Sequence, residues 1–174
     1  MLLSQRGELS GLPHGLTAAV PVMALSQSLT RQGFDQKGIP VIDPQAALIY
    51  IMVMVSAADS DMADAELQVI GDIVNHLPIF ADYDKKRLTQ DLRACAAMLG
   101  RDAGLEEALK SVKAAIPPKL RETAYAIACD VAAAGGEISQ ETLRLLELLR
   151  HRLGLDRLVA AAVERSARAR FSRA

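Results

Sequence analysis

The chain is 174 residues long, and 51% of it is hydrophobic although only 3% is aromatic and Trp is absent. A core without large rings has to be built from aliphatic and alanine side chains, which favours close-packed helices over strands. The formal net charge of -1 gives no general attraction to nucleic acid, so we expect no nucleic-acid partner.

Hydrophobicity and cysteine usage indicate the compartment. No stretch approaches the roughly 18 consecutive apolar residues of a membrane-spanning helix. The two cysteines, Cys95 and Cys129, lie in Ala-rich helical stretches and lack metal-ligand spacing, so we expect buried free thiols in a reducing environment. These features predict a cytoplasmic protein.

Residues 1–42 differ in composition from the remainder. Five glycines and three prolines interrupt their apolar segments, which leaves room for only a short helix over residues 18–31. We therefore predict a partly disordered leader here, not a second domain.

Residues 43–170 are predicted to form one all-α domain of about seven helices. The first runs over 45–57, after Asp43 as N-cap and Pro44 at the first helical position. It is apolar on nearly every side, so we expect it to be the central helix. The second is expected from about Asp61 to His76. The other five are predicted over residues 83–99, 102–116, 119–134, 139–152 and 156–168.

The turn between the first two helices is acidic. Four carboxylates lie within eight residues: Asp59, Asp61, Asp64 and Glu66. Such a turn could supply oxygen ligands to a hard divalent cation. It is not an EF-hand loop, because the sixth position counted from Asp59 is Asp64 where that loop requires Gly. Helix capping by Asp61, with Asp64 and Glu66 favouring the helix dipole, is the structural alternative, and it leaves Asp59 unexplained.

Two segments of the chain, each a helix, a turn and a second helix, align with each other. The same offset matches apolar positions both before and after the turn. Such agreement over two successive helices predicts two related helix–acidic turn–helix units. The apolar positions that match are Ile51 with Ile127, Val55 with Val131, Leu67 with Leu143, Ile70 with Leu146, and Ile73 with Leu149.

The two turns read A-A-D-S-D-M-A-D-A-E-L (57–67) and A-A-A-G-G-E-I-S-Q-E-T-L (132–143). Both resemble the repeated turn of the tellurite-resistance TerB family, and L-G-L-D (153–156) also fits. The resemblance covers about residues 43–165. It implies an all-α, non-enzymatic module in stress response or protein-complex assembly. It also implies that the two turns converge on a site for a divalent cation (Ca, Mg or Zn) or for a partner.

The second turn departs from the family pattern. Gly135 replaces the motif's Asp and Thr142 its Glu, so that charge comes only from Glu137 and, one residue early, Glu141. Asp130, before the turn, could compensate. The resemblance thus implies a set of candidate metal ligands taken mostly from the first turn: Asp59, Asp61, Asp64, Glu66 and Glu137.

The C-terminal segment from residue 150 is rich in arginine, with seven Arg and only two acids. Arg157, Arg165 and Arg168 are therefore candidate contacts for a protein partner or for peripheral binding to an anionic membrane. A solvated helix end explains the same pattern. No nucleophile or phosphate-binding motif is present, so we expect no catalytic residue and no enzyme. The oligomeric state stays open.

Overall fold

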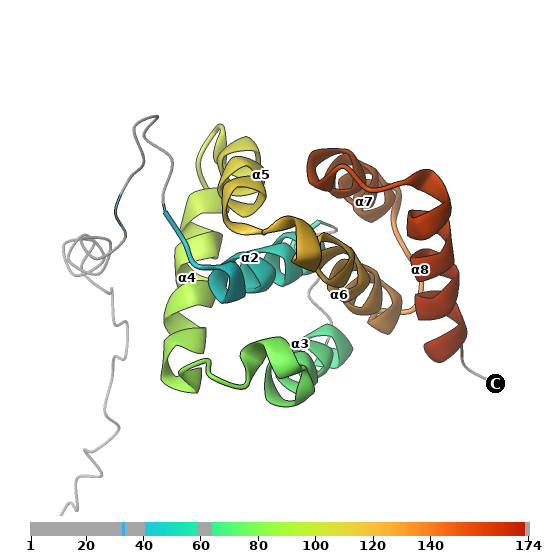
Figure 1. Ribbon diagram of the computed structural model, residues 1–174, viewed down its shortest axis with the longest axis horizontal. Helices are drawn as coiled ribbons and strands as arrows, with labels where there is room; N and C mark the ends of the chain where they lie inside the picture. The colour runs from blue at the N-terminus through green and yellow to red at the C-terminus, as the bar shows by residue number, and fades with distance from the viewer. Residues whose placement is uncertain (1–32, 34–40, 59–63, 173–174) are drawn as a thin grey trace, which may run out of the picture. The chain divides into compact units, whose positions relative to one another are not determined.

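The computed structural model describes residue 33 and residues 41–58 and 64–172 of the chain. Within these residues the prediction of an all-α fold is confirmed, because they form seven α-helices and no strand. Most of the predicted leader, including its helix over 18–31, lies outside the described residues. The helices (Figure 1) are α2 (Pro44–Ser56), α3 (Asp64–His76), α4 (Leu88–Leu99), α5 (Gly104–Ala115), α6 (Arg121–Ala134), α7 (Gln140–Leu153) and α8 (Arg157–Arg170).

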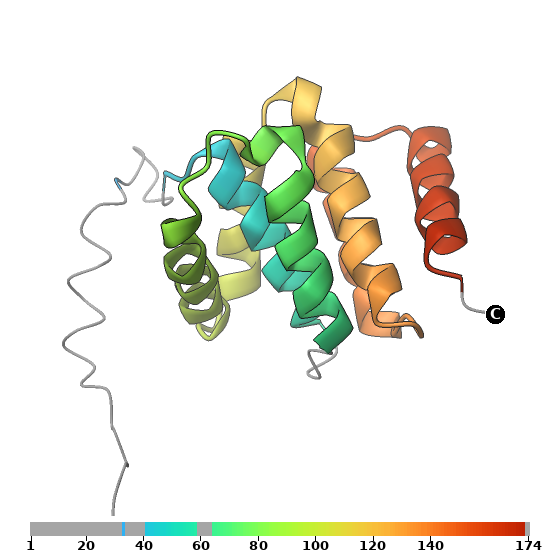
Figure 2. The ribbon, with the colours of Figure 1, turned by 90° about the horizontal axis from the view of Figure 1, so that it is seen from below.

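Helix α2 is the centre of the bundle, as its apolar sequence predicts. The Asp43 side chain accepts a hydrogen bond from the backbone N–H of Ala46 at 2.8 Å, and Pro44 occupies the first turn. Every residue from Ala46 to Ser56 is buried. The helix packs against α4, α5 and α6, and it lies among them in both ribbon views (Figures 1 and 2).

The predicted starts of three helices, α4, α5 and α6, were wrong. Helix α4 begins at Leu88 and not near Tyr83, because Lys85–Arg87 forms a separate 3-10 turn after Asp84. Helix α6 likewise begins after the 3-10 turn Pro118–Leu120. Both turns continue the polar and apolar pattern of the following helix, so periodicity alone does not separate them from it.

Helix α5 begins two residues later than predicted. Its N-cap is Ala103, which makes no side-chain cap hydrogen bond, and Asp102 is exposed before it. At the first helical position, Gly104, an added Cβ would lie only 2.0 Å from the carbonyl oxygen of Met98. The close contact between the ends of α4 and α5 therefore requires glycine at this start, which has no N-cap side chain.

The last two helices begin where the sequence predicts. Ser139 Oγ accepts from the N–H of Thr142 at 3.1 Å, and Asp156 Oδ1 accepts from the N–H of Leu158 at 2.7 Å. Gly154, which ends α7, has a positive φ of 66°, a conformation that glycine adopts without steric cost. This residue turns the chain so that α8 packs on α6, at the edge of the bundle (Figure 2).

The predicted repeat stays a prediction. Ile51 and Ile127, which it matches as core positions, are both buried, but Leu67 and Leu143, which we also expected in the core, are 48% and 43% exposed because neither side chain is covered by a neighbouring helix. The turn that would complete the first unit, residues 59–63, lies outside the described residues.

Candidate functional site

The structure places only part of the predicted acidic site. Asp59 and Asp61 lie outside the described residues, and Asp64 is the first residue of α3, with its side chain not described. Glu66, in the first turn of α3, is only 5% exposed. Among the described residues there is no group of three or more His, Cys, Asp or Glu side chains placed to hold a metal ion.

Glu66 lies against the second turn. A Cβ added to Gly135, the residue after α6, would be 2.9 Å from Glu66 Oε1. The carboxylate therefore occupies space that a side chain at position 135 would need. An Asp at this position, as in the family motif, would require Glu66 to move. The absence of the motif's Asp at position 135 and the burial of Glu66 therefore belong to the same contact between α3 and the second turn. The sequence did not indicate this contact.

The other second-turn carboxylates do not gather around Glu66 in the way the resemblance implies. Glu137 is exposed in the turn between α6 and α7. Asp130, which could have compensated for the missing charge, forms an ion pair with Arg170 of α8. Glu141 lines a different hollow, near the start of α7, together with Arg144. Of the described carboxylates, Glu66 is therefore the one placed between α3 and the second turn.

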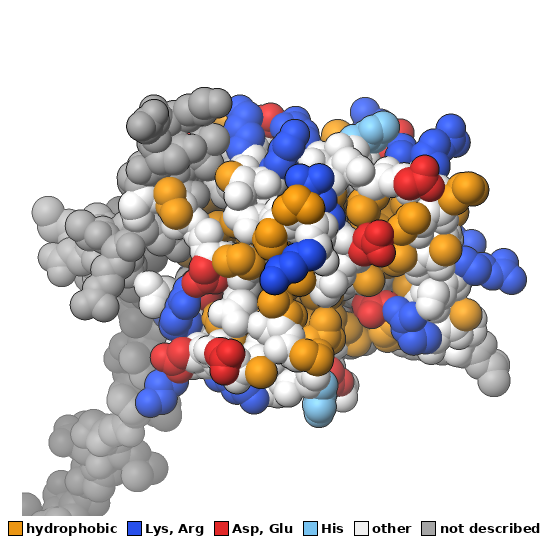
Figure 3. All heavy atoms as spheres, viewed as in Figure 1, with side chains coloured by type: hydrophobic (Ala, Val, Ile, Leu, Met, Phe, Trp, Pro, Cys, Tyr) orange, Lys and Arg blue, Asp and Glu red, His pale blue; other side chains and the backbone are white. Residues whose placement is uncertain are grey.

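The arginines of α8 divide into two kinds. Arg170 pairs with Asp130 of α6, while Arg157, Arg165 and Arg168 are exposed and make no ion pair with any described residue. These three residues, which we call the arginine flank, are the predicted partner contacts. Lys and Arg side chains are prominent along the upper edge of the molecule, over α5 and α7, and along the right-hand edge, where α8 lies (Figure 3).

Helix α8 is fastened to α6 through Ala160 and Ala167, which are buried, and through Glu164. Tyr125 Oη of α6 donates to Glu164 Oε1 at 2.6 Å, and burial together with this carboxylate raises the pKa of the tyrosine. The apolar stripe of α8 is therefore already used in packing, and its exposed side is basic.

A groove that sequence reasoning missed runs between α7 and α8, over α6. Its main part has a volume of about 530 Å³, and a smaller part of about 70 Å³ continues it toward Cys129. We call it the α7–α8 groove. A signal for it was available in the sequence, since Leu143 breaks the polar outer side of its helix; its side chain is 43% exposed. The residues that line both parts are Ala133, Ile138, Leu143 and Arg168; the main part adds Gly136, Phe171 and Ser172, and the smaller part Cys129, Leu146, Glu164 and Ala167.

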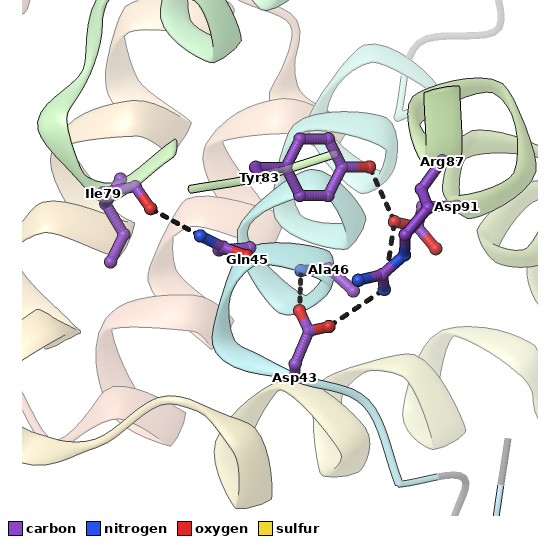
Figure 4. Close-up of polar contacts among 7 residues, drawn as sticks. All are labelled: Asp43, Gln45, Ala46, Ile79, Tyr83, Arg87 and Asp91. Atoms are coloured by element: carbon purple, nitrogen blue, oxygen red, sulfur yellow. Dashed lines mark hydrogen bonds and ion pairs between the residues drawn. The ribbon is translucent and has the colours of Figure 1, made fainter. Parts of the chain in front are cut away.

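A second cluster of charged groups joins the start of α2 to α4 (Figure 4). Tyr83 Oη donates to Asp91 Oδ2 at 2.7 Å, and Arg87 contacts Asp43 at 2.9 Å and Asp91 at 3.6 Å. Asp91 is buried, and this burial raises its pKa even though Tyr83 and Arg87 favour the carboxylate. Each group has a partner within the cluster, so its role is to hold α2 against α4.

The two cysteines are buried free thiols, as predicted. Burial raises the pKa of Cys95 and of Cys129 to about 12, so both thiols are protonated near neutral pH. Neither is therefore placed to act as a nucleophile.

Among the described residues, no helix has both the length and the apolar content needed to cross a lipid bilayer. Comparison of the chain with protein-family models finds no match, and comparisons with curated proteins and with solved structures find none either. The class that the described fold defines is an all-α helical bundle. The TerB resemblance stays a hypothesis within that class.

Proposed function

We propose that the chain is a non-enzymatic, TerB-like helical module that acts in protein-complex assembly in the cytoplasm. It would bind an acidic protein partner through the arginine flank. The observation that carries this proposal is the placement of Arg157, Arg165 and Arg168, exposed on one helix and without an ion pair among the described residues. Charges of one sign on a helix at the edge of a bundle attract a partner of opposite charge and speed its association.

Peripheral binding to an anionic membrane is the alternative for the same arginines. A helix that lies in a membrane surface inserts its apolar face into the lipid. In α8 that face packs on α6 through Ala160 and Ala167, which leaves Leu158, 82% exposed, as its large apolar side chain facing solvent. The arrangement therefore favours a protein partner over a lipid surface.

The proposal is tested by cross-linking the full chain to its neighbours in the cells that produce it and identifying them by mass spectrometry. We expect a protein cross-linked near α8 with the wild type. We expect its loss when Arg157, Arg165 and Arg168 are all replaced by Gln. The control replaces Arg93, Lys113 and Lys119 by Gln, which removes the same charge from exposed positions elsewhere. Equal capture by both triple variants would refute the proposal. Arginine-dependent binding to phosphatidylserine vesicles without a protein neighbour would favour the membrane alternative.

A second candidate function is divalent-cation binding by the acidic turn, with Asp59, Asp61, Asp64, Glu66 and Glu137 as ligands for Ca, Mg or Zn. The position of the Glu66 carboxylate against Gly135 supports it, because a ligand from the first turn reaches the second. A role in stress response, including tellurite resistance, rests on the family resemblance alone.

Calorimetric titration of the full chain with Ca²⁺, Mg²⁺ and Zn²⁺ tests the cation site. We expect binding heat with the wild type and a loss of affinity in Asp59→Ala and Asp61→Ala, because each removes an oxygen ligand. Asp102→Ala, an exposed acid before α5, is the control and should bind as the wild type does. The absence of heat, or the same heat from all variants, rules the site out.

A further inference from the structure

The arginine flank and the α7–α8 groove share one side of α8. Residues spaced three or four apart on a helix lie on the same side, so Arg157, Ala161, Glu164 and Arg168 form one row. Glu164 and Arg168 of this row line the groove. Arg157 lies on the same side of α8, beyond the lining residues of the groove and toward the start of the helix, and Arg165, four residues after Ala161, flanks the same row.

The floor of the groove is apolar. Ala133 at the end of α6, Ile138 in the following turn and Leu143 on α7 line both of its parts. Leu143, in the first turn of α7, is a large apolar side chain and yet 43% exposed. Helices α7 and α8 both pack on α6 and leave this surface between them. An occupant would have to cover apolar side chains and face arginine on one side.

The distance between the two arginines of this row indicates the shape of the occupant, since the Glu164 between them is already bonded to Tyr125. Arg157 and Arg168 are separated by about 16 Å along the helix axis, from the rise of 1.5 Å per residue. A compact small molecule does not span such a row, whereas an α-helix lying along the groove does. The chain's own leader does not match in charge, because its residues 1–42 hold only two acids, Glu8 and Asp35, against three basic residues, Arg6, Arg31 and Lys37.

We infer that the α7–α8 groove seats an amphipathic helix of the partner protein. The apolar face of this helix covers Ile138 and Leu143, and its acidic flank pairs with Arg157, Arg165 and Arg168. This is the helix-in-groove mode of recognition, with apolar anchors for affinity and charges for orientation and choice of partner. The inference rests on the proposed function, and it adds the kind of partner and the surface that receives it.

A displayed library of amphipathic helical peptides tests this inference, with the full chain as the labelled target. Half of the peptides carry Asp and Glu beside the apolar face, and the other half carry Lys at the same positions. We expect the acidic half to be enriched. Affinities of the selected peptides, measured by fluorescence anisotropy, should fall by roughly tenfold or more when Arg157, Arg165 and Arg168 are replaced by Gln. They should also fall as salt is added.

The Leu143→Glu variant tests the contribution of the apolar groove to binding separately from the contribution of the arginines. It removes an apolar contact and places a like charge beside the acidic flank, so we expect a loss of affinity of at least tenfold. Leu105→Glu is the matched control, because Leu105 is also 43% exposed but lies on α5, outside the groove. Both changes are at half-exposed positions, and equal unfolding midpoints of the two variants would establish that folding is unaffected.

The outcomes distinguish the inference from the proposed function. If Leu143→Glu binds the acidic peptides as Leu105→Glu does, or if Lys-flanked peptides are enriched equally, the groove inference is wrong. If cellular cross-linking still depends on the arginines in that case, the proposed function stands with a different contact surface. Binding to phosphatidylserine vesicles that requires the arginines, with no peptide selected, overturns both.

Discussion

Gly104→Ala is expected to destabilise the fold by about 3 kcal/mol, the largest effect of any single methyl group that the structure indicates. The added Cβ would lie 2.0 Å from the carbonyl oxygen of Met98 and 2.9 Å from the Cα of Leu99. Both atoms belong to the backbone, so no side-chain rotation relieves the contact. The end of α4 or the start of α5 would have to move. Urea unfolding followed by circular dichroism measures the change.

Gly71→Ala is the control for this prediction. Gly71 lies inside α3, and an added Cβ there would meet nothing within 4 Å. Alanine stabilises a helix interior relative to glycine by roughly 0.5–1 kcal/mol, so this variant should be more stable than the wild type. If Gly104→Ala is stabilised to a similar extent, the close contact between α4 and α5 is wrong.

Asp91→Ala is expected to cost about 2 kcal/mol at neutral pH. It removes the acceptor of the Tyr83 hydroxyl group, which is buried, and one of the two carboxylates near Arg87. A buried polar group that loses its partner costs roughly 1–3 kcal/mol. The free energy of unfolding from urea titration, compared between wild type and variant, gives the value.

The cost of Asp91→Ala should increase as the pH falls. Burial raises the pKa of Asp91 above its ordinary value of 3.8, so the folded state holds this proton more tightly than the unfolded state does. The part of the stability that comes from this tighter proton binding is therefore fully present below pH 3.8 and is lost as the pH rises through the folded pKa, and it adds to the hydrogen bond from Tyr83 that acts at neutral pH. Unfolding curves of wild type and variant, recorded from neutral pH down to 3.8, should separate further on acidification.

Glu106 is the control, because its pKa is shifted in the opposite direction to that of Asp91. Its carboxylate accepts hydrogen bonds from Arg152 at 2.7 and 2.9 Å, which lowers its pKa below the ordinary 4.5. Its contribution is present above that value and is lost on acidification, so the difference between wild type and Glu106→Gln should shrink as the pH falls. If the Asp91→Ala difference also shrinks, the carboxylate of Asp91 is stabilised in its charged form, contrary to our expectation.

The sequence contains good signals for helices that have a cap and a distinct apolar stripe. Asp43, Ser139 and Asp156 each accept the backbone hydrogen bond that N-cap residues make, and each was recognised from its position before an apolar run. The start of α5 has no such signal, because Ala103 makes no side-chain cap. Gly104 packs there against the backbone of Met98, and a pattern along the sequence does not contain that contact.

The sequence predicted individual residues of the candidate site but not the contacts between them. The sequence identified Arg157, Arg165 and Arg168 as exposed basic residues, and it singled out Gly135 as the place where the second turn loses its charge. It did not indicate that Arg170 is neutralised by Asp130, since these residues are far apart in the chain. Pairing between distant side chains depends on how α8 packs on α6.

By itself, the sequence determined an all-α chain with α2 at its centre, because apolar periodicity and caps act within one helix. The tertiary structure alone decided that Glu66 lies against Gly135 and that α7 and α8 leave an apolar groove. This groove is lined by Arg168, one of three α8 arginines without an ion pair among the described residues. The physical reason is the same in both cases. Which side chains meet, and which surfaces stay open, depends on the distances between helices, and no spacing along the chain specifies those distances.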